Sequence, residues 1–204
     1  MIPLSKIERS EFSQNGEDGI INWLVSRLKL CHKMFVEIGS GSGKQNNTTW
    51  LVMKGWAGVV IDRRIKSIEN YKKRGFKAVI AHALEVSPEN AGDVLMMFSV
   101  EPDLFSIDID SFDFVVLKRF MILGFRPQII VCEYNSKYGD DDVVVLWTET
   151  AHKISGCSLS AWKRMLGSYG YEFVTVESRR VNAFFVRQGS VNLDCLKEID
   201  WLEK

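Results

Sequence analysis

The sequence predicts an α/β fold in which a doubly wound, mostly parallel sheet ends in an antiparallel hairpin. Short apolar segments alternate with helical patterns five times between residues 15 and 133. The fifth segment contains Ile129-Ile130-Val131-Cys132, an apolar run typical of a parallel strand buried on both faces. Two later strand patterns, 171–177 and 183–187, are close enough in sequence to form a hairpin. This order of elements favours a Rossmann-like architecture.

The first half of the chain contributes three strands and three helices to this prediction. Residues 15–30 carry apolar side chains at helical spacing, which predicts an amphipathic helix through Ile20, Ile21, Leu24, Val25 and Leu28. Strands are expected at 34–38, at 57–61 with Asp62 closing it, and at 76–81. Helices are expected at 47–54 and 65–74, because Gly55 and Gly75 follow them as stop signals.

The second half continues the alternation and then departs from it. A helix is expected at 88–98, with Pro88 near its first turn, followed by a strand at 104–109. A helix at 112–123 and a strand at 128–133 complete the parallel part. Residues 135–156 are long, polar and irregular, so we expect a substrate-side loop before the helix at 158–168.

The composition indicates one soluble domain. The chain has 204 residues, 46% of them hydrophobic, so we expect residues 1–204 to form a single domain with 1–33 as an N-terminal helical extension. Lys and Arg total 26 and Asp and Glu total 26, so net charge gives nucleic acid no support as a partner without excluding RNA. Neither a membrane span nor a secretory signal is expected. The cysteines are scattered without a CxxC pair, which indicates free thiols in a cytoplasmic protein.

A glycine-rich stretch follows the first expected strand. Glu37 closes that strand, and Gly39, Gly41 and Gly43 come next at alternate positions. The third glycine is one residue too early for the dinucleotide pattern G-x-G-x-x-G, and the P-loop spacing fails as well. A carboxylate before the turn suits a cationic ligand without phosphate, such as S-adenosylmethionine.

Asp62 is the expected partner of the ribose of this ligand. It follows Glu37 by 25 positions (62 − 37), close to the offset of about 20 residues at which an acid binds ribose in dinucleotide sites. Asp62 could instead cap the helix that begins at Ile65. His82, after the third strand, is a candidate neighbour of the adenine, or else an ordinary surface histidine or a core histidine with its hydrogen bonds satisfied.

Acidic residues gather at the ends of the fourth and fifth strands. Asp108 and Asp110 should share one strand face by alternation, and Glu133 closes the neighbouring strand. Such carboxylates can act as a general base, and Asp110 and Glu133 could also hold a divalent ion such as Mg²⁺. For Asp113 we favour a simple role at the helix start.

With these residues in place, the chain resembles the class I S-adenosylmethionine-dependent methyltransferases, and more narrowly the FkbM-type family. The resemblance lies in residues 12–20, 35–48, 55–62, 104–110, 130–135, 156–159 and 182–187. It implies a seven-stranded sheet with one antiparallel strand in the terminal hairpin. It also implies methyl transfer to oxygen, often on sugars or natural products, with Gln14 and Asp18 as polar contacts near the site. Asp62 departs from the pattern, since many relatives carry Glu there.

These observations together predict an O-methyltransferase that acts on a sugar or other small molecule. The alternatives are an RNA methyltransferase and a module that binds a cofactor or nucleotide without catalysis. The predicted catalytic residues are Asp108, Asp110 and Glu133. The predicted cofactor-binding residues are Gln14, Glu37, Gly39, Ser40, Gly41, Asn47, Asp62, Arg63, His82, Ala83 and Asp108.

Overall fold

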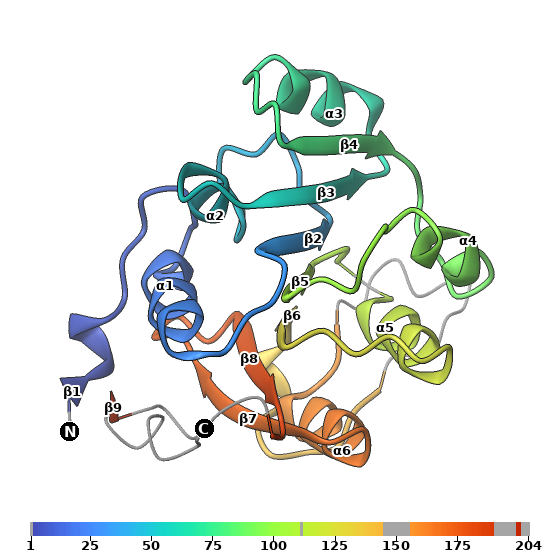
Figure 1. Cartoon of the computed structure of the whole chain (residues 1–204). Coiled ribbons are helices and arrows are strands. Elements are labelled where there is room, and N and C mark those ends of the chain that lie inside the picture. Colours follow the sequence, from blue (N-terminus) through green and yellow to red (C-terminus); the bar gives the residue numbers. More distant parts are fainter. Residues whose placement is uncertain (1, 111, 145–155, 190–198, 201–204) are drawn as a thin grey trace.

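A seven-stranded sheet in the order β4-β3-β2-β5-β6-β8-β7 lies at the centre of the chain (Figure 1). The structure is a computed structural model that describes residues 2–110, 112–144, 156–189 and 199–200. Six strands run in the same direction, and β8 alone in this sheet is antiparallel to both of its neighbours, which confirms the predicted fold class. The strands of this sheet are β2 (Met34–Ile38), β3 (Ala57–Asp62), β4 (Val79–Ala83), β5 (Leu104–Ile107), β6 (Ile129–Glu133), β7 (Tyr171–Val176) and β8 (Asn182–Arg187).

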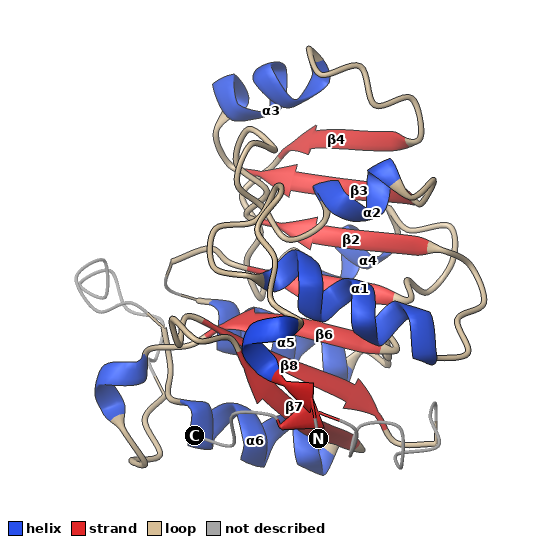
Figure 2. Cartoon of the chain, turned by 90° about the vertical axis from the view of Figure 1, so that its left-hand side faces the viewer, coloured by secondary structure: helices blue, strands red, loops and turns tan. Residues whose placement is uncertain are grey.

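The strand order reverses at β2, which lies between β3 and β5. Glu37 is in register with Val60 of β3 on one side and with Ser106 of β5 on the other. The arrowheads of β2, β3 and β4 point the same way in Figure 2, so their carboxyl ends meet at one edge of the sheet. Ligands of doubly wound sheets bind at this edge, next to the reversal.

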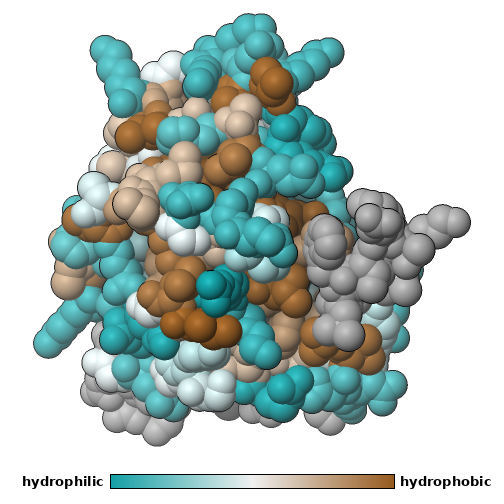
Figure 3. Space-filling model, turned by 90° about the vertical axis from the view of Figure 1, so that its right-hand side faces the viewer, coloured by the Kyte–Doolittle hydropathy of each residue, from teal (hydrophilic) through white to brown (hydrophobic). Residues whose placement is uncertain are grey.

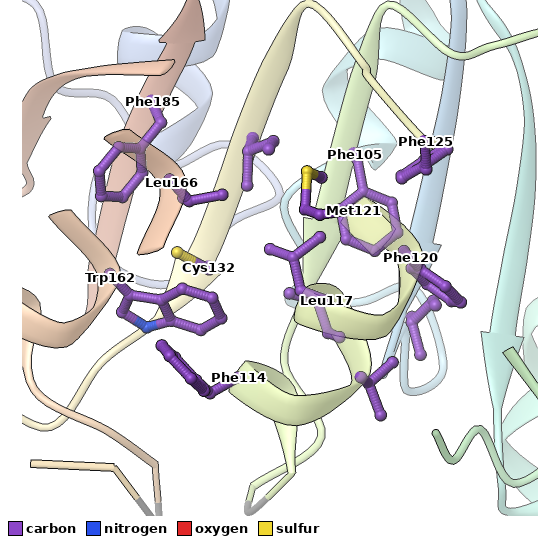
Figure 4. Close-up of a cluster of buried hydrophobic side chains, with 14 of the residues drawn as sticks. Phe105, Phe114, Leu117, Phe120, Met121, Phe125, Cys132, Trp162, Leu166 and Phe185 are labelled. Carbon is purple, nitrogen blue, oxygen red and sulfur yellow. The ribbon is translucent and has the colours of Figure 1, made fainter. Parts of the chain in front are cut away.

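Helices cover both faces of the sheet, and each face has its own hydrophobic core. Helices α1 (Glu17–Arg27), α2 (Thr49–Met53) and α3 (Ile65–Lys72) contribute buried residues to one core. Helices α4 (Ala91–Leu95), α5 (Asp113–Ile122) and α6 (Leu159–Ser168) contribute to the other. Figure 4 shows the second core, in which the ring of Phe105 lies 5.8 Å from that of Phe120 and 5.1 Å from that of Phe125. The central strands are therefore covered on both faces, as predicted for β6.

Several element boundaries differ from the predictions. The third strand runs from Val79 to Ala83 rather than over 76–81, and β5 ends at Ile107 rather than at residue 109. Helices α2 and α4 are shorter than expected, with five residues each. A short pair that we did not predict joins β1 (Ile2–Pro3) to β9 (Ile199–Asp200). The loop predicted at 135–156 contains the short helix η2 (Ser136–Tyr138), and its residues 145–155 lie outside the described part.

The segment before α1 is held by the first turn of that helix. The Asp18 carboxylate is fully buried and accepts the backbone N–H groups of Glu11, Phe12 and Ser13. Ser13 in turn accepts the Asp18 N–H through its hydroxyl. These bonds fix the path of the chain around Gln14, which brings this early segment to the carboxyl edge of the sheet.

The side of the molecule that carries α4 and α5 is shown in Figure 3. Met96, Ile122 and Leu123 are exposed apolar residues of these two helices and the turns that follow them. The hydrophobic surface in this view is interrupted by hydrophilic side chains. Among the described residues, no helix is long and apolar enough to cross a membrane.

Candidate active site

A cavity of about 460 Å³ opens at the carboxyl ends of β2, β3 and β5, beside the reversal of strand order. Its wall combines the glycine turn after β2, the end of β3, the segment after β4 and the segment after β5. The lining residues that were predicted from the sequence are Gln14, Gly39, Gly41, Asp62, Arg63, Asp108 and Asp110. Residues from distant parts of the sequence thus meet at the predicted edge.

The glycine turn is required by its close approach to the neighbouring strand. Gly39 has a φ of 89°, and a Cβ atom there would lie 1.6 Å from the carbonyl oxygen of Asp108. The Asp108 N–H donates to the Ile38 carbonyl at 2.9 Å, so the two loops are joined at their bases. Only glycine fits between them, because any side chain would collide with the Asp108 backbone.

Asp62 lies at the end of β3 and is only 4% exposed. Its Oδ2 accepts the N–H of Gly41 at 2.9 Å, and its Oδ1 accepts the N–H of Arg64 at 2.8 Å. Burial alone would raise the pKa of Asp62, but these bonds and the Arg64 guanidinium lower it below its usual value. Asp62 is therefore an ionised acceptor that also positions the glycine turn.

Glu37 lies below the turn and is 4% exposed. Its carboxylate accepts the Asn47 N–H at 2.9 Å, the Thr48 hydroxyl at 2.6 Å and the side-chain amide of Asn46 at 2.5 Å. Burial is the main cause that raises the pKa of Glu37 to about 7. Through these hydrogen bonds Glu37 holds residues 46–48 against the carboxyl end of β2.

A small cavity of about 40 Å³ beside the main one is lined by three carboxyl residues: Glu17, Glu37 and Asp108. Gln14 and Gly39 line both cavities. Asn47 lines the small one, and its side chain donates to the Ser106 hydroxyl at 3.1 Å. Ser40 is 2% exposed, and its hydroxyl has no hydrogen-bond partner within the described part of the chain. The acidic lining suits a positively charged group.

The wall contributed by β4 comes from later residues than the sequence indicated. His82 and Ala83 lie within β4, because the strand begins three residues later than expected (79 − 76). The cavity is lined instead by Leu84, Glu85 and Val86, with Leu84 N–H bonded to the Asp62 carbonyl at 3.0 Å. Sequence reasoning missed this wall. Its signal was the apolar pair Leu84 and Val86 on either side of Glu85.

The three predicted catalytic carboxylates meet in one group. Ligand oxygens of Asp108, Asp110 and Glu133 all lie within 4.8 Å of one another. The reason that we gave for this was wrong: β5 ends at Ile107, so strand alternation does not place Asp108 and Asp110 on one face. Asp110 instead has a φ of 67°, and the bend after β5 turns both acids toward the end of β6. This geometry could hold a divalent cation.

The proximity of these acids changes their proton affinities. Loss of hydration among the neighbouring groups and repulsion from Asp110 raise the pKa of Asp108 to about 6, although the side chain itself stays partly open to solvent. Burial and then Asp108 raise the pKa of Glu133 to about 9, and a hydrogen bond joins the two carboxyl groups. The two carboxyl groups titrate as one pair, which therefore shares a single proton near neutral pH.

Asp113 supports the bend that carries these acids. It begins α5, as predicted, is 1% exposed, and accepts the Ile109 N–H at 2.8 Å. Its Oδ2 is buried without a partner among the described residues. Burial raises the pKa of Asp113 to about 7. Its role is structural, because it fixes the backbone between Asp108 and the helix.

The comparisons with known proteins give the class of fold. Magnesium protoporphyrin IX methyltransferase (ChlM) from Synechocystis PCC 6803, solved with bound SAH, has a TM-score of 0.53 at 12% identity and covers 84% of this chain and 82% of its own. The SAH-bound methyltransferase PaMTH1 from Podospora anserina has a TM-score of 0.53 at 16% identity, covering 86% and 80%. A putative O-methyltransferase from Klebsiella pneumoniae has a TM-score of 0.52 at 14% identity, covering 88% and 84%.

The chain therefore has the Rossmann-like fold of class I S-adenosylmethionine-dependent methyltransferases. No family model matches the chain, and no curated protein sequence matches it.

Proposed function

We propose that the chain is an S-adenosylmethionine-dependent O-methyltransferase of the FkbM type that methylates a hydroxyl group of a sugar or another small molecule. The observation that carries this proposal is the position of Asp108, which lines the cavity beside the glycine turn and belongs to the group of three acids. The candidate general base is therefore itself part of the wall of a cofactor-sized cavity. We also propose that residues 1–204 act as one domain in the cytoplasm, in keeping with the buried free thiols of Cys132 and Cys157.

The lining residues fit each part of the cofactor. The apolar residues Leu84, Val86 and Phe112 offer a slot for the adenine ring at the cavity wall. Asp62 is ionised and lies at the cavity wall, where it can accept hydrogen bonds from the ribose hydroxyls. The acidic lining of the small cavity suits the ammonium group of the methionine end.

The chain's own residues would supply positioning and proton removal. When bound, the cofactor supplies a methyl group on a positively charged sulfur. Asp108 would accept the proton of the acceptor hydroxyl as that oxygen takes the methyl group, and the electrons of the broken sulfur–carbon bond would stay with the cofactor. Glu133, holding its own proton, keeps Asp108 in place through their hydrogen bond. Asp110 is the second candidate for the base, because it lies in the same group.

A divalent ion such as Mg²⁺ is the other group that these acids could hold, with Asp110 and Glu133 as ligands. The support is the spacing of the three carboxylates, which oxygen-seeking cations prefer. Turnover measured after exhaustive treatment with EDTA, and again after added Mg²⁺, separates the two mechanisms. Unchanged turnover without metal leaves proton transfer to Asp108 as the mechanism.

The decisive experiment is calorimetry with S-adenosylhomocysteine on the wild-type chain and on Asp62→Ala. We expect the wild type to bind. The variant should lose about 1–3 kcal/mol of binding free energy, because the ribose hydroxyls no longer meet a buried carboxylate that accepts their hydrogen bonds. An unchanged dissociation constant would contradict the ribose role of Asp62. A chain that binds the product but consumes no S-adenosylmethionine with any hydroxylated acceptor would be a binding module instead.

A further inference from the structure

A second cavity, of about 690 Å³, lies beyond β6, and its lining mixes aromatic, hydroxyl and basic side chains. The aromatic residues are Tyr134 and Phe173, and the hydroxyl groups come from Ser136 and Ser160. Lys163 and Arg180 bring two positive charges, against one carboxylate from Asp140. The cavity of about 460 Å³ beside the glycine turn does not include these residues, so the two cavities have different chemistry.

The second cavity lies at the same edge of the sheet as the three acids. Glu133 pairs with Asn182 at the start of β8, and the Tyr134 N–H donates to the Val181 carbonyl at 2.8 Å. The turn between β7 and β8 is therefore level with the carboxyl end of β6. Because Tyr134 directly follows Glu133, one wall of this cavity continues from the strand end that carries the acid group.

Arg180 is presented to the cavity by a turn that is fixed from both sides. Glu177 is fully buried, and its carboxylate accepts the backbone N–H groups of residues 179 to 182. On the other side, Glu8 accepts the N–H and the hydroxyl of Ser178, both at 2.6 Å. Arg180 adopts a φ of 60° in this turn, and its guanidinium forms no ion pair with a described carboxylate. An arginine that a fixed turn places at a cavity wall, without an ion pair to a described carboxylate, is suited to an anion.

Lys163 brings the second positive charge from α6. Its Nζ lies 4.0 Å from the centre of the Phe173 ring, so the ammonium is held against the aromatic part of the wall. Ser160 lies three positions earlier on the same helix (163 − 160), one turn away. The wall thus combines an aromatic surface, two hydroxyl groups and two cations against one carboxylate, which suits a ring that carries a carboxylate or a phosphate.

We propose that this cavity binds an anionic group of the methyl acceptor, with Lys163 and Arg180 contacting the carboxylate or phosphate and Tyr134 and Phe173 packing against the adjoining ring. The acceptor would then be a small hydroxylated molecule that carries a negative charge. This inference rests on the proposed function, because it places the acceptor hydroxyl next to Asp108 and Glu133. It narrows the acceptor class from any hydroxyl compound to anionic ones.

The test uses the full chain and three probes of similar size: phenyl phosphate, benzoate and benzyl alcohol. Their binding is titrated by ligand-observed NMR with and without S-adenosylhomocysteine. We expect at least one anionic probe to bind about tenfold or more tightly than benzyl alcohol, and the better of the two identifies phosphate or carboxylate as the preferred group. Lys163→Met and Arg180→Met should each weaken anion binding by about tenfold. The matched controls Lys118→Met and Arg119→Met, exposed on α5, should leave it unchanged.

Three results would overturn the proposal. The first is equal affinity for all three probes. The second is a loss of anion binding in the control variants as large as that in Lys163→Met and Arg180→Met. The third is a short RNA that binds through Lys163 and Arg180 and excludes phenyl phosphate. Calorimetry with S-adenosylhomocysteine distinguishes this failure from failure of the proposed function. If the wild-type chain does not bind S-adenosylhomocysteine, the proposed function is wrong. The probes titrated alone still test the second cavity in that case.

Discussion

Arg64 binds both carboxylate oxygens of Asp62, with Nε 3.0 Å from Oδ1 and Nη2 3.1 Å from Oδ2. The backbone N–H groups of Arg64 and Gly41 add one bond to each oxygen, at 2.8 and 2.9 Å. A carboxylate has about four acceptor positions, so Asp62 is saturated. If Asp62 accepts the ribose hydroxyls, they have to displace the guanidinium, because the backbone donors are fixed.

Replacing Arg64 should therefore strengthen cofactor binding. The Arg64 side chain is 63% exposed, so its ion pair contributes little and can be displaced at small cost. We expect Arg64→Met to bind S-adenosylhomocysteine up to about fivefold more tightly than the wild type, by calorimetry. Lys66→Met, exposed at the start of α3, is the control for a general effect of charge. Weaker binding in Arg64→Met would mean that the guanidinium contacts the ligand.

Gly39→Ala should disrupt both loops of the site. A Cβ at this position meets the Asp108 carbonyl oxygen at 1.6 Å and has to adopt a φ of 89°. Strain and displacement together should lower the free energy of unfolding by about 2–5 kcal/mol in urea titrations. Gly92→Ala is the matched control, since nothing lies within 4 Å of its Cβ, and helix propensity should make it neutral or up to about 1 kcal/mol more stable. Equal midpoints for the two variants would show that the glycine turn tolerates a side chain.

The pH dependence of turnover should report the pair formed by Asp108 and Glu133. The pKa of Asp108 is raised to about 6 and that of Glu133 to about 9. We expect kcat/KM to rise with pH until Asp108 is ionised near pH 6 and to fall as Glu133 loses its proton near pH 9. Asp108→Asn should abolish turnover while product binding changes little. A profile that is flat through the lower pKa, or turnover retained in Asp108→Asn but lost in Asp110→Asn, would move the base to Asp110.

Asp113 should make the fold less stable as the pH rises. Its pKa in the folded chain is about 7, against 3.8 for an unperturbed aspartate. Between these values the unfolded chain releases a proton that the folded chain keeps, so the free energy of unfolding falls with pH and levels off above about 7. The upper limit of this fall is about 4 kcal/mol, at 1.36 kcal/mol per pKa unit.

Asp113→Asn should remove this part of the pH dependence, because the amide keeps an acceptor for the Ile109 N–H and has no charge to bury. Urea titrations at a series of pH values compare the two chains. Glu37 titrates in the same range in both, so the difference between the curves reports Asp113 together with the smaller effect of its charge on Glu133. Parallel curves for wild type and variant would contradict a raised pKa at this residue.

The strands next to the reversal were predictable because their neighbours in sequence end them sharply. Residues 34–38 and the strand from Ala57 to Asp62 were predicted with the bounds that the structure has, since glycines follow the first and precede the second. Helix α6 was predicted equally well, because Ser158 caps it by accepting the Ala161 N–H. In each case a local signal coincides with the tertiary structure.

The predictions failed where tertiary contacts overrode the local pattern. Phe76 looks like the start of a strand, but its ring packs against Tyr71 of α3 at 5.8 Å, so β4 begins later. Asn90 looks like the interior of a helix, yet its side chain accepts the Ser87 N–H and donates to the Glu85 carbonyl, which delays α4. The Arg64–Asp62 pair and the Glu37 network depend on side-chain directions that no spacing rule contains.

Because β4 lies at the edge of the sheet, the cavity wall that continues from it should open more readily than the central strands. In β2 every residue is buried, whereas Ile80 in β4 is 59% exposed, and among the described strands only β3 pairs with β4. Amide hydrogens of β4 should therefore exchange with solvent deuterium by local opening, long before those of β2, whose exchange requires unfolding of the whole sheet. Because residues 84–86 continue from β4 into the cavity wall, a bound ligand should slow exchange along this strand most of all.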